Sequence, residues 1–243
     1  MSKKSKIEPK TSKRSRRENN AVSSGIVEPN PSKYTWLVEG DTEEAYMNSL
    51  FSHLEDSTRV RLKYEKSKPI NLKGGRKEPY LDKINSYLNI PRRKFICIFD
   101  LDIVRTNESN FNKYKALIDK KKQFENTDDS DEPSVIFCTN MPSFEYWLLL
   151  HFAYTSAYYE TESGIEKILK KHLPEYEKNK VANLFSKLCG SDDTNLINAI
   201  KNSTKSAKAS KGQRLDEVSK MKECNVSYSD MHLLFEGKQK MPR

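Results

Sequence analysis

The sequence predicts a soluble α/β protein with a parallel sheet of about four strands, flanked by helices, and a helical C-terminal appendage. Between residues 34 and 153, apolar runs alternate four times with amphipathic runs, a pattern typical of a parallel sheet covered on both faces. From about residue 154 onward, only the helical period of apolar residues remains. We therefore expect a basic tail at 1–33, an α/β core at 34–153 and a mainly helical extension packing on it at 154–243.

The first two strand–helix units occupy residues 34–88. Tyr34–Val38 is a short aromatic and aliphatic run that predicts a buried strand, and Asp41 is placed to cap the helix that follows. Residues 59–64 alternate apolar and polar side chains, which predicts a half-buried second strand. A loop over residues 67–79 leads to a second helix over residues 80–88.

Two further units complete the predicted sheet. Phe95–Phe99 is entirely apolar and is the most strand-like stretch of the chain. A helix over Phe111–Phe124 and an acidic loop at Asp128–Glu132 separate it from a fourth strand at Val135–Cys138. Ser143–Phe152 then predicts a buried helix. Three shorter helical patterns follow, at residues 165–169, 181–188 and 195–199.

Composition limits the class of protein. The net charge is +9, and residues 1–33 alone contain nine basic and three acidic side chains. This tail either binds a polyanion or only keeps the chain soluble. No apolar run approaches the roughly 20 residues of a membrane span, and no apolar segment follows the basic N-terminus. We therefore expect a cytoplasmic protein without a membrane partner, whose four cysteines are reduced thiols with no metal-ligand spacing.

Two of the predicted strands end in acidic residues. Glu39 and Gly40 follow the first strand, while Asp100 and Asp102 follow the third. The carboxyl ends of parallel strands gather at one edge of a sheet, which is where ligands bind. An extended backbone would turn Asp100 and Asp102 to the same side, and Glu43 lies in the first helical turn after Glu39. The sequence therefore predicts that four carboxylates converge at this edge.

Carboxylates gathered in this way repel one another, so without a cation their pKa values must rise. Oxygen ligands without His or Cys suit Mg²⁺ or Mn²⁺. Such ions activate water and stabilise the leaving oxygen of a phosphodiester. The pattern is therefore compatible with metal-dependent phosphodiester chemistry, whereas each motif taken alone also fits a helix cap or a solvated strand end.

Two segments resemble known families. Glu39-Gly40-Asp41-Thr42-Glu43 and Asp100-Leu101-Asp102 resemble the motif pair of the Toprim domain, which topoisomerases, primases and overcoming-lysogenization-defect nucleases share. Residues 142–152, Pro-Ser-Phe-Glu-Tyr-Trp-Leu-Leu-Leu-His-Phe, resemble the signature of RloB-like (AbiLii-type) abortive-infection proteins. The resemblance extends over about residues 34–235. Val226 and Tyr228 depart from the closing pattern of that family, so we assign no site residue there.

The resemblance implies a Toprim-like sheet and a nuclease that acts in defence against phage, usually alongside an ATPase partner. It implies that Glu39, Asp100 and Asp102 are catalytic metal-site residues, with Glu39 also a candidate general base. Glu43 would be a ligand of a second metal or a supporting ligand.

Two further residues, Glu145 and His151, belong to the family signature. Glu145 either joins the metal site from the exit of the fourth strand or is a buried carboxylate bonded to backbone amides at a helix start. We expect His151, six residues further on, to be structural.

Basic residues provide candidates for nucleic-acid binding. Toprim-type nucleases often add a lysine, and Lys205, Lys208 and Lys211 form a basic run that either contacts phosphate or is an ordinary solvated face. The loop after the predicted second strand contains two glycines, whose backbone could approach a phosphate. Its spacing is not that of a Walker motif, which argues against nucleotide hydrolysis. The candidate nucleic-acid-binding residues are Lys73, Arg76, Lys77, Lys205 and Lys211.

Two other functions fit part of the pattern. Phe99-Asp100-Leu101-Asp102 also resembles the nucleophile strand of haloacid-dehalogenase-like phosphatases, but Val104 stands where that family has Thr. Alternatively, the carboxylates hold a metal in a non-catalytic subunit that binds nucleic acid or docks a partner. The residues do not distinguish DNA from RNA as the substrate.

Overall fold

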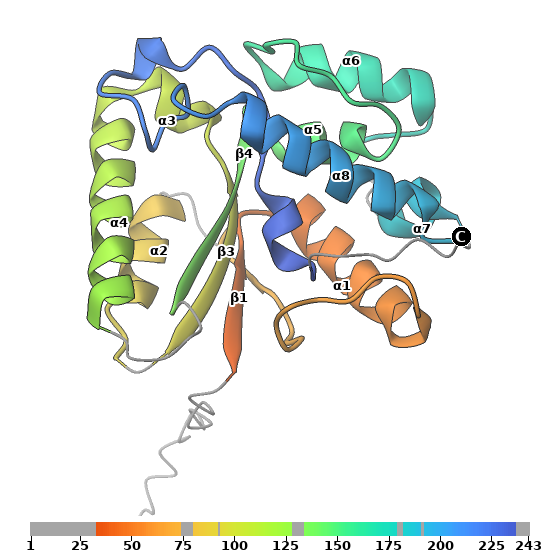
Figure 1. Ribbon diagram of the computed structural model, residues 1–243, viewed down its shortest axis with the longest axis horizontal. Coiled ribbons are helices and arrows are strands. Elements are labelled where there is room, and N and C mark those ends of the chain that lie inside the picture. Colours follow the sequence, from red (N-terminus) through yellow and green to blue (C-terminus); the bar gives the residue numbers. More distant parts are fainter. Residues whose placement is uncertain are drawn as a thin grey trace, which may run out of the picture.

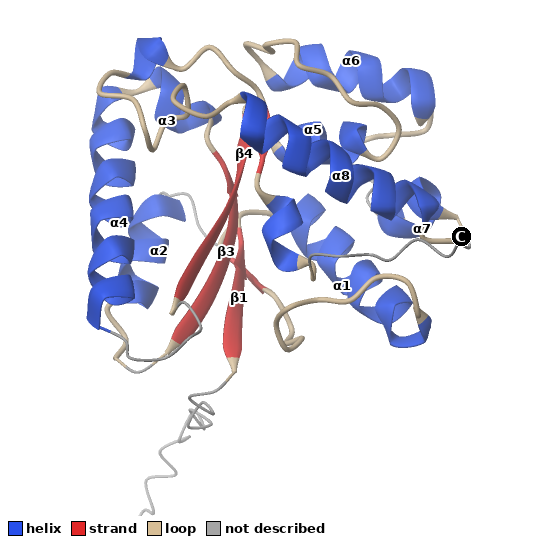
Figure 2. Ribbon diagram, in the orientation of Figure 1, coloured by secondary structure: helices blue, strands red, loops and turns tan. Residues whose placement is uncertain are grey.

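A five-stranded sheet forms the centre of the protein in the computed structural model, with strand order β2-β1-β3-β4-β5 (Figures 1 and 2). The strands are β1 (Tyr34–Val38), β2 (Ile70–Asn71), β3 (Lys94–Asp100), β4 (Val135–Met141) and β5 (Tyr228–Ser229). The first four are parallel, and β5 pairs antiparallel with β4. The predicted α/β class with a mostly parallel sheet is thus confirmed.

The structure describes residues 33–73, 80–91, 93–127, 134–178, 182–190 and 192–236. The predicted basic tail therefore lies outside the described residues except for Lys33. The same holds for the acidic loop at 128–132 and for residues 74–79 of the glycine-containing loop. Cys97, Cys138, Cys189 and Cys224 are all buried free thiols. None of the helices in the described ranges combines the length and apolar character that a membrane span requires.

Helices cover both faces of the sheet, as Figure 1 shows. One face carries α1 (Asp41–Asp56), α5 (Phe144–Leu150), α6 (Glu162–His172), α7 (Leu184–Cys189) and α8 (Thr194–Ala209). The other carries α2 (Tyr80–Leu88), α3 (Asp102–Thr106) and α4 (Glu108–Thr127). Two 3₁₀ turns, η1 (Met221–Glu223) and η2 (Met231–Leu234), lie near the C-terminal end of the described chain.

The alternation of side chains along β3 explains the two layers. Ile96 and Ile98 pack into the core shared with α1, α5 and α8, whereas Phe95, Cys97 and Phe99 pack against α2 and α4. A strand buried on both faces needs apolar residues at every position. This is why the continuous run in β3 and the similar run in β4 were recognisable in the sequence.

The predicted strand at residues 59–64 is wrong. Val60 is buried there, but only Leu62 forms a β-bridge, to Phe235. The segment pairs locally with the end of the described chain, where the Lys63 amide donates to the Leu234 carbonyl at 2.9 Å. One side of this segment packs on the core, which produces the alternation without a sheet strand. The second strand of the sheet is Ile70–Asn71, within the predicted loop.

Two local predictions also need correction. Gly40, not Asp41, is the N-cap of α1, and the Asp41 carboxylate instead accepts hydrogen bonds from Lys73 and Asn71, each at 2.9 Å. Asp102 does not continue an extended strand, because Leu101 leaves the β conformation and Asp102 is the first residue of α3.

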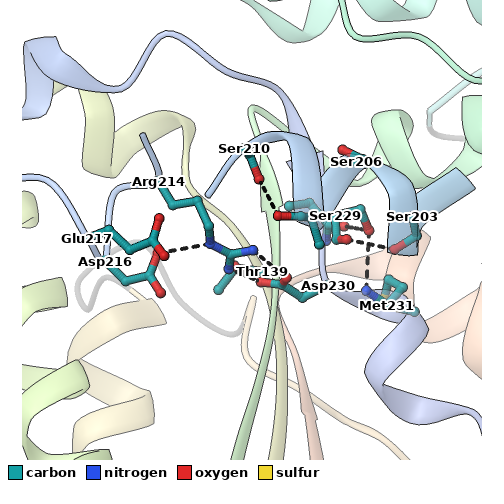
Figure 3. Close-up of polar contacts among 12 residues, drawn as sticks. Thr139, Ser203, Ser206, Ser210, Arg214, Asp216, Glu217, Ser229, Asp230 and Met231 are labelled. Carbon is teal, nitrogen blue, oxygen red and sulfur yellow. Dashed lines mark hydrogen bonds and ion pairs between the residues drawn. The ribbon is translucent and has the colours of Figure 1, made fainter. Parts of the chain in front are cut away.

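A partly buried ion pair attaches β5 to the sheet (Figure 3). Arg214 donates to both carboxylate oxygens of Asp230, at 2.8 and 2.6 Å, and its guanidinium stacks 4.2 Å from the centroid of the Tyr228 ring. The Thr139 hydroxyl of β4 donates to the same carboxylate at 2.7 Å. The Asp230 amide donates to the Thr139 carbonyl at 2.9 Å. This network fixes a strand of two residues, too short to carry a sequence pattern.

We expect Arg214→Leu to lower the free energy of unfolding by about 3 kcal/mol, because it leaves the Asp230 carboxylate buried without its counter-charge. The measurement is urea unfolding followed by circular dichroism. Lys33→Ala, which removes an exposed ion pair with Glu65, is the control and should cost less than about 1 kcal/mol. Equal effects of the two substitutions would contradict the structural role of the Arg214–Asp230 pair.

Candidate active site at the carboxyl edge of the sheet

Acidic residues lie at or just after the carboxyl ends of three adjacent parallel strands, at the same edge of the sheet. Glu39 directly follows β1, Asp100 is the last residue of β3, and Glu145 is the second residue of α5, which follows β4. Val38 pairs with Ile98, so the ends of β1 and β3 are nearly level. Each parallel strand is followed at this edge by its helix. Glu43, in the first turn of α1, and Asp102, at the start of α3, therefore lie at the same edge as the other acidic residues.

The ends of β1 and β3 are joined through a carboxylate. The Asp100 amide donates to Glu39 Oε2 at 2.8 Å, and the Glu39 amide donates to the Ile98 carbonyl at 3.1 Å. Gly40 allows Glu43 to approach this junction, because a β-carbon at Gly40 would lie only 3.3 Å from Glu43 Oε2. The Glu39-Gly40 turn therefore brings both glutamates close to Asp100.

Several of these carboxylates are buried with incomplete hydrogen bonding. Glu43, Asp100 and Glu145 are 5%, 7% and 1% exposed. Within the part of the chain that the structure describes, Asp100 Oδ1 and Glu145 Oε2 have no hydrogen-bond partner. Burying a charged oxygen without a partner is costly. These orphaned oxygens fit a site that takes a cation.

The electrostatics reflect this crowding. Burial, and then repulsion from Glu43 and Asp102, raises the pKa of Glu39 to about 8, although the Asp100 amide opposes the shift. Burial and the charge of Glu145 raise the pKa of Glu43 to about 7. The pKa of Asp100 is well above its ordinary value, first because of burial and then because of Glu39 and Glu43. Burial likewise raises the pKa of Asp102.

Glu145 belongs to this acidic cluster. Its charge contributes to the raised pKa values of Glu43 and Asp100. Its Oε1 accepts a hydrogen bond from the Tyr176 hydroxyl at 2.8 Å, so the carboxylate is held by a side chain and not by the backbone amides that we considered from the sequence. Of the two roles left open, the geometry favours participation in the site.

Lys178 is a functional candidate that the sequence did not indicate. Its ammonium lies 2.5 Å from Glu162 Oε1 and 3.8 Å from Glu145 Oε1, and its charge lowers the pKa of both Glu39 and Glu43. It lies between α6 and α7 in a segment without regular structure. No motif or periodicity singles out a lysine in such a segment, so only the fold identifies it.

The predicted basic residues lie in different surroundings. Lys73 forms an ion pair with Asp41, and both side chains are more than 60% exposed. Lys205 and Lys211 are exposed, in α8 and just beyond it. Arg76 and Lys77 lie outside the described residues.

His151 is buried, and both of its ring nitrogens are engaged. Nε2 lies 3.1 Å from the Tyr46 hydroxyl, and Nδ1 lies 3.1 Å from the Trp147 carbonyl. Burial lowers the pKa of His151 to about 4. These contacts agree with the structural role expected for it.

In their present positions, the side chains of the acidic cluster do not form a complete set of metal ligands. Among the residues with described positions, no three His, Cys, Asp or Glu side chains are arranged to hold a metal ion. The available donors are nevertheless all oxygens, two of them orphaned, and such a set matches Mg²⁺ or Mn²⁺. A bound cation would have to draw the carboxylates of Glu39, Glu43, Asp100 and Asp102 together.

Comparison with known proteins identifies the family. The family model described as RloB-like protein matches residues 36–237, which is most of the chain. The protein therefore belongs to the RloB-like family. No curated protein and no solved structure matches the chain.

We expect the free energy of unfolding to fall between pH 6.5 and 8.5 when divalent cations are absent. An unfolded glutamate titrates near 4.5, whereas folded Glu39 and Glu43 titrate near 8 and 7, so the folded state binds more protons up to pH 8. Urea unfolding at a series of pH values measures this slope. Burial lowers the folded pKa values of His151 and His232, so both oppose this fall near pH 6.5. Both are neutral in the folded and unfolded states by about pH 8.

Glu39→Gln combined with Glu43→Gln is the matched control, since neither amide titrates. In this variant, the free energy of unfolding should depend much less on pH between 6.5 and 8.5. In the wild-type chain, Mg²⁺ should increase the free energy of unfolding more at pH 8.5 than at pH 6.5. A wild-type stability that rises across this range would contradict the assigned electrostatics.

Proposed function

We propose that this protein is a Toprim-type, divalent-metal-dependent nuclease that cleaves phosphodiester bonds in DNA or RNA. The observation that carries the proposal is the set of partly unpartnered, buried carboxylates at the ends of three neighbouring parallel strands. We further propose that it acts in abortive-infection defence against phage with an ATPase partner. Membership of the RloB-like family supports that setting.

In this proposal, Glu39, Asp100 and Asp102 hold the cation, and Glu43 assists from the start of α1. Mg²⁺ or Mn²⁺ bound there would supply an activated water and a counter-charge for the leaving oxygen. The hydrogen bond from the Asp100 amide fixes the position of the Glu39 carboxylate, and Gly40 leaves room for Glu43 Oε2 beside it. Glu39 is also the candidate general base. Its pKa of about 8 describes the cation-free site, because a bound cation would favour the charged carboxylate and lower that pKa.

Tyr176 and Lys178 complete the proposed site from the C-terminal part of the chain. The Tyr176 hydroxyl binds one oxygen of Glu145 and leaves the other, Oε2, available. The Lys178 side chain is 48% exposed, so its ammonium can reach both the acidic cluster and a phosphate in solvent. A positive charge at this place would stabilise the charge that develops on the scissile phosphate.

Two contacts of Asp193 argue against a phosphatase of the haloacid-dehalogenase type. The later acidic motif of such an enzyme would be Asp192-Asp193, but Asp193 bonds to His53 at 2.7 Å and to Ser57 at 2.8 Å. These bonds join the end of α1 to the start of α8, so Asp193 is engaged in packing.

We expect purified protein to cleave plasmid DNA, phage DNA or transfer RNA in the presence of Mg²⁺ or Mn²⁺. Asp100→Asn combined with Asp102→Asn should reduce the cleavage rate at least about 100-fold, because these side chains hold the cation. The assay is gel electrophoresis of labelled substrates over time, with chelator as a blank.

Asp119→Asn, which removes an exposed carboxylate on α4, should cleave at the wild-type rate. If wild type and the double variant leave all three substrates equally intact, with an ATPase partner also supplied, the nuclease proposal fails. Release of inorganic phosphate from small phosphomonoesters would favour a phosphatase instead.

We expect Lys178→Ala to lower kcat about 10- to 100-fold with a smaller change in KM, because its charge acts on the developing phosphate charge. Lys178→Arg should recover part of this loss, since it keeps the positive charge. Single-turnover cleavage at saturating substrate measures the effect. A pure increase in KM for Lys178→Ala would assign Lys178 to substrate binding alone.

A further inference from the structure

The outer face of α8 has an unusual charge pattern. Residues 194–215 contain five basic side chains and no Asp or Glu. Lys201, Lys205 and Lys208 follow the spacing i, i+4, i+7, which places them on one face of a helix. Lys211 continues the series just beyond the helix, and all four are exposed. We call these four residues the α8 lysine face.

The positive charge of the α8 lysine face is not balanced by nearby carboxylates in the part of the chain that the structure describes. None of its four ammonium groups pairs with a carboxylate among the described residues, whereas lysines of other helices do, such as Lys121 with Glu125 and Lys170 with Glu166. Like charges three or four residues apart destabilise a helix. An anionic ligand would relieve that repulsion.

The face is also connected to the candidate active site. α8 packs against α5, which contains Glu145. The hydroxyl of Tyr146, the residue after Glu145, lies 3.1 Å from Ser206 Oγ of α8. Ser203 and Ser206 donate to the backbone carbonyls of Ser229 and Ser227, which binds the C-terminal half of α8 to the β5 segment. Figure 1 shows α8 running from α7 toward the carboxyl end of β4.

We propose that the α8 lysine face binds the phosphate backbone of nucleic acid and leads it to the carboxylate site. Lys201 and Lys208 are separated by about 10 Å along the helix axis, enough to span about three phosphates of one strand. The Lys205 ammonium lies 3.8 Å from the centroid of the partly buried Tyr154 ring. An aromatic ring beside backbone-binding cations is typical of single-strand binding surfaces. This inference rests on the proposed nuclease function for its substrate.

Binding can be tested separately from cleavage by keeping the protein in chelator. The probes are a fluorescein-labelled 20-nucleotide single strand and a 20-base-pair DNA duplex, with anisotropy recorded from about 50 to 200 mM salt. The test variant is K201Q/K205Q/K208Q. The control is K113Q/K121Q/K122Q, which removes the same charge from α4 on the opposite face of the sheet.

The α8 variant should bind at least one probe about tenfold more weakly at 0.1 M salt. Its slope of log affinity against log salt should be smaller by about 2–3, close to one unit for each lost phosphate contact. The α4 control should stay within about twofold of wild type. The single variants K201Q, K205Q and K208Q should each lower the slope by about 1, which keeps the test valid if the triple variant folds poorly.

Equal binding by the α8 and α4 variants, or no binding by wild type, would overturn the proposal. Vesicles containing 30% phosphatidylserine provide a second anionic surface, and loss of vesicle binding alone would assign the face to a membrane. If Asp100→Asn combined with Asp102→Asn binds normally and wild type never cleaves, the nuclease proposal fails while the binding surface stands.

Discussion

Mutual repulsion among buried carboxylates at the carboxyl edge of β1, β3 and β4 is the constraint that organises this molecule. Glu39, Glu43, Asp100 and Glu145 are close enough to raise one another's pKa values, or those of their neighbours, in addition to the effect of burial. Apolar packing alone would not gather acids in this way, because each buried charge opposes folding. The cost makes sense for a site that acquires a cation, and we propose that it does.

The C-terminal part of the chain is bound into this arrangement. Tyr176 and Lys178 contact Glu145 from the segment between α6 and α7, and the Arg214–Asp230 pair holds β5 beside β4. α8 lies between these two attachments and packs on α5. The proposed catalytic and binding residues therefore come from both halves of the chain.

The sequence predicted the parts of the fold that are long, apolar and regular. β3 and β4 were recognisable because strands buried on both faces contain continuous apolar runs, such as Phe95–Phe99 and Val135–Cys138. The acids at the ends of β1 and β3 could be placed at one edge by topology. β2 and β5 have two residues each, so neither carries a pattern. Lys178 could not be predicted because long-range packing, and no local motif, brings it to Glu145. The RloB-like resemblance is confirmed by the family match.

Calorimetric titration of the protein with Mn²⁺ at pH 7.5, in two buffers that differ in ionisation enthalpy, tests the carboxylate centre most directly. The account predicts saturable binding accompanied by proton release, because Glu39 and Glu43 are partly protonated before the cation arrives. Asp100→Asn combined with Asp102→Asn should abolish that binding. Absence of binding to the wild-type chain, or undiminished binding to the double variant, would contradict it.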